Sequence, residues 1–67
     1  MNYAISVKDG HGKRYVRAYD SFAALFTEDS RLAWRFATRD AAMMVGDLVW
    51  KRYPAMLVNI EERPRYA

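Results

Sequence analysis

Residues 38–54, TRDAAMMVGDLVWKRYP, form the one stretch long enough to organise the rest of the chain. Its apolar side chains recur at spacings of three and four, which places them on one face of a helix of about four turns. Thr38 can cap the first turn through its hydroxyl, and Pro54 ends the helix because it pushes Tyr53 away from helical geometry. We therefore predict an amphipathic helix over about Thr38 to Tyr53. Its core-facing residues are Ala41, Ala42, Val45, Leu48, Val49 and Tyr53.

Shorter segments on both sides of this helix alternate apolar and polar residues, which is the period-two pattern of a half-buried strand. The first runs from Tyr3 to Lys8, the second from Arg14 to Tyr19 and the last from Ala55 to Glu62. The turn Asp9-Gly10-His11-Gly12 joins the first two, because its glycines supply the positive φ angles of a tight hairpin. These patterns predict an N-terminal β-hairpin and a C-terminal strand.

The segment between the hairpin and the long helix is ambiguous. Residues 22–26 are an apolar run that fits either a third strand or a packed loop, and residues 28–36 fit either a strand or a short helix. With period two, Leu32, Trp34 and Phe36 share a face; with period 3.6, Leu32 and Phe36 point inward together with Ala33. We favour the short helix, because Thr-Glu-Asp-Ser at 27–30 resembles a capped first turn.

The order of these elements predicts an α+β fold. The hairpin and the C-terminal strand form a small antiparallel sheet, and the main helix and the short preceding helix pack on one face of it. We expect residues 1–67 to be a single small domain and residues 63–67 to form a frayed tail. The predicted core consists of Ile5, Val7, Val16, Val45, Leu48, Val49, Val58 and Ile60.

Composition narrows the class of protein. The chain has 67 residues, 52% of them apolar, and no cysteine, so it depends on a dense core or on a partner for stability. The lack of cysteine fits a reducing compartment. We find no apolar leader and no apolar run approaching the ~20 residues of a membrane-spanning helix, and we expect a cytoplasmic protein. The net charge of +3 permits nucleic acid or an acidic protein as partner and demands neither.

Residues suited to catalysis are scarce. His11 is the only histidine and lies between two glycines in the predicted hairpin turn, without a cysteine or a paired carboxylate placed to work with it. The serines lack a second histidine that could activate them. The sequence therefore predicts a protein that is not an enzyme, with no cofactor and no metal site.

A contact surface has more support. Met43 and Trp50 lie on a flank of the predicted helix, off the core-facing stripe, and both residue types are adaptable or large enough to be common at interfaces. Arg39 lies one turn before Met43, and Arg35 enters from the preceding segment. We predict that Arg35, Arg39, Met43 and Trp50 form a partner-binding surface. The alternative that Trp50 only covers the edge of the sheet stays open.

A second candidate surface lies on the hairpin. Val16 and Ala18 are expected to face the core, which leaves Tyr15, Arg17 and Tyr19 on the open face of the sheet. Arginine between aromatic rings is typical of surfaces that stack on single-stranded bases. Because eight acidic residues are interleaved along the chain, we expect nucleic-acid contact to be weak.

One pattern carries a resemblance. Phe26-Thr27-Glu28-Asp29, Ala33, Phe36-Ala37-Thr38 and Ala41 resemble the corresponding part of many short proteins encoded by phages and prophages. Such proteins open with a hairpin, continue into an amphipathic helix and close with a strand. They are often non-catalytic inhibitors or adaptors of one host protein, anti-CRISPR proteins among them. The resemblance implies an inhibitor that blocks a host protein complex by steric occlusion; a small basic nucleic-acid-binding regulator and a homodimer are the alternatives.

Overall fold

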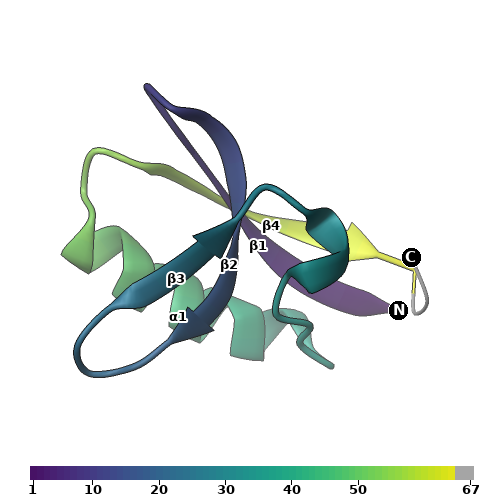
Figure 1. Ribbon diagram of the computed structural model, residues 1–67. Coiled ribbons are helices and arrows are strands. Elements are labelled where there is room, and N and C mark those ends of the chain that lie inside the picture. Colours follow the sequence, from purple (N-terminus) through teal and green to yellow (C-terminus); the bar gives the residue numbers. More distant parts are fainter. Residues whose placement is uncertain (65–67) are drawn as a thin grey trace.

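The computed structural model describes residues 1–64 and contains a four-stranded sheet and one long helix (Figure 1). The elements are β1 (Asn2–Asp9), β2 (Gly12–Tyr19), β3 (Ala24–Thr27), the 3-10 turn η1 (Ser30–Leu32), α1 (Arg39–Arg52) and β4 (Leu57–Arg63). The α+β class is confirmed, and the apolar run before η1 forms the third strand. β4 continues to Arg63, where the predicted tail begins, and residues 65–67 lie outside the described part.

All neighbouring strands are antiparallel, in the order β3-β2-β1-β4. β1 pairs with β4 from Asn2↔Arg63 to Lys8↔Leu57 without a break in register. With β2 it pairs only from Ser6↔Tyr15 to Asp9↔Gly12, so the first half of β1, from Asn2 to Ile5, is not paired with β2. The outer backbone edge of β4 pairs with no other strand within residues 1–64, and we call it the free edge.

The gap between β1 and β2 is filled by the segment that follows η1. The amide of Trp34 donates to the carbonyl of Val16 at 2.9 Å, and Phe36 and Tyr3 exchange two backbone hydrogen bonds of 2.8 and 2.9 Å. The predicted short helix is therefore only the single turn of η1, and residues 34–36 are paired with the sheet. Burying separated strands without such a partner would leave backbone groups unsatisfied.

A β-bulge changes the faces of β2. The register with β3 shifts between Val16 and Ala18, so the alternation reverses at Arg17. Tyr15 consequently joins a cluster on one face of the sheet, while Tyr19 packs against the core on the other. The prediction that Tyr15 and Tyr19 flank Arg17 on one open face is wrong. Ala18, predicted to face the core, leaves that face for the same reason.

The main core lies between α1 and the sheet. Its buried members are Ile5, Val7, Val16, Phe36, Ala42 and Val49. Val45, Val58 and Ile60 pack against it half-buried, as members of the predicted core. Leu48 is 46% exposed, so its assignment to the core is wrong. The helix instead turns its Ala42–Gly46–Val49 line toward the sheet.

A smaller cluster covers the opposite face of the sheet. Ala33, the residue after η1, packs there with Ala4 and Tyr15. Since Ala4 alternates with the core residue Ile5 along β1, this face is the one turned away from α1. In Figure 1, α1 lies behind the sheet and η1 in front of it. The two helical elements thus lie on opposite faces, and only α1 covers the main core.

Val49→Asp tests the orientation of α1. Val49 is fully buried, and an unpaired buried carboxylate costs several kcal/mol, comparable to the ~5 kcal/mol that stabilises a domain of this size. We expect this variant to lose its cooperative urea transition, which is measured by circular dichroism.

Leu48→Asp is the matched control, because Leu48 is the preceding residue and is 46% exposed. A change at such a position should alter the free energy of unfolding by less than ~1 kcal/mol. Equal destabilisation by the two substitutions would contradict the observed helix orientation.

Candidate functional site

An open apolar groove runs between α1 and β4. It has a volume of about 190 Å³. Its lining residues are Met43, Gly46, Asp47, Trp50, Val58 and Ile60. We call it the α1–β4 groove. Met43, Asp47 and Trp50 come from α1 at spacings of three and four, and Val58 and Ile60 alternate along β4. Each of the two elements thus forms one side of the groove.

Gly46 sets the depth of the groove. A Cβ atom at this position would lie 3.3 Å from Cδ1 of Ile60 and 3.5 Å from Cγ1 of Val58. Because glycine has no side chain, α1 approaches β4 closely at its middle, and the flanking side chains of α1 form a wall above this contact. Met43 and Trp50 make up that wall and are 46% and 53% exposed. The groove is thus shallow, apolar and accessible.

The free edge borders the groove. β4 keeps an unbroken register with β1 over its seven residues, and Pro64 follows only after its end. The sheet also ends at β3, which is only four residues long. An edge strand presents unpaired N–H and C=O groups that can pair with another chain. β4 offers the longer row of such groups, next to exposed apolar side chains.

The groove side of β4 is acidic. Asp47 lies in the groove, and Glu62 continues the row formed by Val58 and Ile60 on the same face of the strand. Among the described residues, neither carboxylate forms an ion pair. Glu61, on the other face, contacts Lys13 at 2.6 Å and Arg63 at 3.4 Å. Glu61 is therefore paired with two cations, whereas Asp47 and Glu62 form no ion pair with the described residues.

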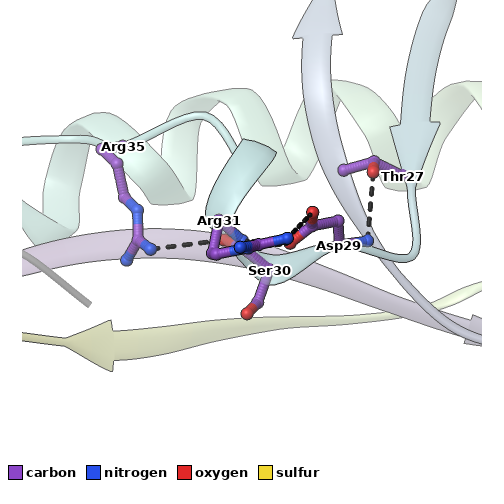
Figure 2. A network of polar contacts seen from close by, with 5 residues as sticks. All are labelled: Thr27, Asp29, Ser30, Arg31 and Arg35. Carbon is purple, nitrogen blue, oxygen red and sulfur yellow. Dashed lines mark hydrogen bonds and ion pairs between the residues drawn. The ribbon is translucent and has the colours of Figure 1, made fainter.

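The structure divides the predicted four-residue surface. Met43 and Trp50 come together in the α1–β4 groove, and Arg39 is the first residue of α1, one turn before Met43 on the same flank. Arg35 is turned toward η1, where its guanidinium donates to the carbonyl of Ser30 at 3.2 Å (Figure 2). We therefore assign Arg35 to the support of the turn.

Figure 2 also shows how η1 is held. The backbone amide of Arg31 donates to the carboxylate of Asp29 at 2.9 Å, and the guanidinium of Arg31 contacts it through Nε at 3.1 Å and a terminal nitrogen at 3.0 Å. The hydroxyl of Thr27 accepts from the amide of Asp29 at 3.1 Å. The guanidinium of Arg31, together with its amide, lowers the pKa of Asp29. This network anchors the segment that enters the sheet.

In the second candidate surface, both tyrosine rings form cation–π contacts with lysine or arginine side chains of the same chain. Tyr15 is only 9% exposed and carries Lys13 and Arg63 at 5.4 and 5.7 Å from its ring centre. Tyr19, on the other face, carries the guanidinium of Arg52 at 5.0 Å. Arg17 is exposed at the bulge between them. The three predicted residues thus do not form one stacking platform.

Four lining residues of the groove were not among the predicted site residues: Gly46, Asp47, Val58 and Ile60. A glycine inside a helical pattern signals a close packing contact, so Gly46 was the one available sign of it. The alternation in β4 placed Val58 and Ile60 together, but on a core face. The strand order, which leaves them beside an edge, depends on pairing that local sequence does not encode.

Residues suited to catalysis or metal binding are few in the described part. His11 is exposed in the hairpin turn, where its amide donates to the Asp9 carboxylate at 2.8 Å. Within residues 1–64, no three His, Cys, Asp or Glu side chains are grouped so as to hold a metal ion. None of the helices in this part is long and apolar enough to cross a membrane.

Comparisons with family models, curated proteins and solved structures find no match to this chain. The function is therefore inferred from the residues and their geometry.

Acid should destabilise the fold, because four carboxylates have lowered pKa values. At Asp9, Asp20 and Asp29 hydrogen bonds lower the pKa; at Glu61 partial burial raises it, and the hydrogen bonds from Lys13 and Ser6 outweigh this effect. A lowered folded-state pKa stabilises the protein above the unfolded-state pKa of about 4, and this contribution is lost as the pH falls through the folded-state value. We expect the urea midpoint to fall below about pH 4.

Asp29→Asn is the control for this pH dependence. It should lower the midpoint at neutral pH and reduce the further loss in acid, because the amide cannot titrate. An unchanged midpoint down to about pH 2 in the unsubstituted protein would contradict the assigned carboxylate interactions.

Proposed function

We propose that this chain is a non-catalytic protein-binding protein that uses the α1–β4 groove and the adjoining free edge. The observation that carries this proposal is the exposure of two large side chains in one open groove: Trp50 is 53% exposed and Met43 is 46% exposed. Tryptophan and methionine are enriched at protein interfaces, and tryptophan in particular is common among residues that dominate binding energy.

The dimensions of the groove favour a protein over a small molecule. Its volume of about 190 Å³ is below the ~300–1,000 Å³ of pockets that enclose small ligands. A further apolar side chain of α1 is exposed beside Met43: Met44, at 71%. Exposed apolar residues that gather around a hollow are typical of sites where one protein contacts another.

The kind of binding protein follows from the resemblance to short phage and prophage proteins. We propose an inhibitor or adaptor, similar to anti-CRISPR proteins, that acts in the cytoplasm by covering a site on a host protein or protein complex. The chain measures 29 × 22 × 18 Å, so its broad side is comparable to the ~800 Å² that one partner buries in a standard interface. A body of this size can block a site sterically without any chemistry.

A small basic nucleic-acid-binding regulator is the weaker alternative. Its expected platform required Tyr15 and Tyr19 on one face, and the bulge in β2 places them on opposite faces. Several arginines are also engaged within the described chain: Arg14 pairs with Asp9 at 2.8 Å, and Arg52 donates to the carbonyls of Asp20 and Ser21. The net charge of +3 remains available for weak electrostatic contact.

Trp50→Ala tests the proposed function. The wild-type protein, immobilised and exposed to nuclease-treated host lysate, should retain a protein partner that the variant does not. Truncating a residue that dominates an interface costs about 2 kcal/mol or more, roughly thirtyfold in affinity, while the half-exposed position should lower the free energy of unfolding by less than ~1 kcal/mol. Affinity is measured with the identified partner by calorimetry.

Phe22→Ala is the matched control, because Phe22 is another large apolar residue, 92% exposed, between β2 and β3. It should leave capture unchanged. If Trp50→Ala instead lowers stability and the folded fraction keeps full affinity, Trp50 only covers the sheet and the proposed surface is wrong.

Salt dependence tests the alternative function. We expect any binding to nucleic acid to be weak and to fall steeply between about 50 and 200 mM salt, because each neutralised phosphate releases counterions. Fluorescence anisotropy with labelled single-stranded and duplex oligonucleotides measures it. Binding of one defined sequence with a Kd of about 1 μM or tighter at physiological salt would place the nucleic-acid function first.

A further inference from the structure

The free edge and the α1–β4 groove are adjacent, so one occupant can use both. We propose that the occupant is an extended, basic segment of another protein, which pairs with β4 as a fifth strand and inserts apolar side chains into the groove. This inference rests on the proposed function and adds the form and chemistry of the partner.

The backbone of β4 selects an extended partner. Its seven residues, Leu57–Arg63, pair with β1 in unbroken register, which leaves one regular row of outward N–H and C=O groups in the described sheet. An added strand hydrogen-bonds to such a row along its length, and its alternate side chains provide specificity. A helix has no free backbone groups to offer along its side, so it would fill the groove and leave the edge unpaired.

The groove selects apolar side chains at every second position. Side chains of an added strand that point toward α1 would enter the space between Ile60 and the wall formed by Met43 and Trp50. Such side chains lie about 7 Å apart along a strand. The volume of about 190 Å³ accommodates one or two large aliphatic or aromatic side chains and no more. The partner motif is therefore short.

The two carboxylates on the groove side favour a basic segment, although Arg39 lies on the same flank of α1. Asp47 and Glu62 lie on the groove side, and in residues 1–64 neither is paired with a cation. Lysine or arginine beside the apolar positions would complement both carboxylates and would increase the association rate. A second copy of this chain could also pair with β4 through its own β4. If both helices then lay on the same side of the joined sheet, the second copy would bring its own Asp47 and Glu62 next to the first pair of carboxylates, which disfavours this occupant.

The opposite edge of the sheet is the weaker alternative. β3 spans four residues, Ala24–Thr27, and its end leads directly into the Thr27–Asp29 hydrogen bond that begins the η1 network. A strand added there would gain about half as many main-chain hydrogen bonds. None of the residues that line the α1–β4 groove, with its wall of Met43 and Trp50, belongs to β3. The edge at β4 is therefore better suited than the edge at β3 to bind an added strand.

Selection from a displayed random library tests the inference. The peptides are about twelve residues long, enough to span the seven residues of β4, and wild-type protein is the target. We expect enrichment of sequences with two large apolar residues separated by one residue and flanked by Lys or Arg. Fluorescence anisotropy of synthesised peptides should show roughly tenfold or greater loss with Trp50→Ala and no change with Phe22→Ala.

Charge reversal tests the basic preference. The double variant Asp47→Lys/Glu62→Lys should weaken the enriched basic peptides by about three- to tenfold, as expected for exposed charge pairs, and should favour acidic versions of the same peptides. Glu28→Lys is the control, because Glu28 is an exposed acid beyond β3, at the other edge of the sheet. An equal effect of both charge changes would overturn local complementarity.

Amide hydrogen exchange distinguishes strand addition from other modes. Bound peptide should slow exchange at alternate residues of β4 by about tenfold or more, because outward amides gain hydrogen bonds. Two outcomes would overturn strand addition and leave the proposed function intact. The first is peptide binding that depends on Trp50 but does not protect β4. The second is Trp50-dependent capture of a host protein when no peptide is enriched. Protection of β4 that rises with protein concentration alone would identify a second copy as the occupant. Loss of both capture and peptide binding would overturn both proposals.

Discussion

The hydrogen bonds that insert residues 34–36 into the sheet are the constraint on which the rest of the structure depends. The pairing of β1 with β2 ends at Ser6↔Tyr15, and beyond this point Trp34 and Phe36 pair with the backbone of Val16 and Tyr3. This insertion also carries the chain from one face of the sheet to the other: Ala33 packs on the outer face, and Phe36 packs in the main core. The start of α1 is thereby placed on the correct side.

The position of α1 follows from this entry and from one glycine. Thr38 caps the helix by accepting from the amide of Ala41, and the helix then runs over β4 and β1. Gly46 permits close approach to Val58 and Ile60. The residues next to this line, Met43 and Trp50, are consequently left half-exposed beside the sheet edge. A larger residue at 46 would lift the helix, so the α1–β4 groove is a consequence of the packing.

The charges show why net charge is a poor guide to a partner of this protein. Its excess of +3 suggests a basic surface, but Arg14 and Arg31 are paired with aspartates, Lys13 is paired with Glu61, and Arg52 supports the turn after β2. Beside the α1–β4 groove, Asp47 and Glu62 form no ion pair with the described residues, and Arg39 lies on the same flank of α1. A candidate site therefore has to be judged by the charges that stay unpaired around it.

The sequence by itself determined the elements that depend on neighbours along the chain. Capping by Thr38 and the stop at Pro54 set the ends of α1, glycines set the hairpin turn, and alternation identified β4; Met43 and Trp50 were also recognised as a flank of the helix. Only the tertiary structure decided that Leu48 is exposed, that Tyr15 and Tyr19 lie on opposite faces, and that β4 is an edge strand. These features depend on the bulge, the inserted segment and the strand order, which are set by hydrogen bonds between residues far apart in sequence.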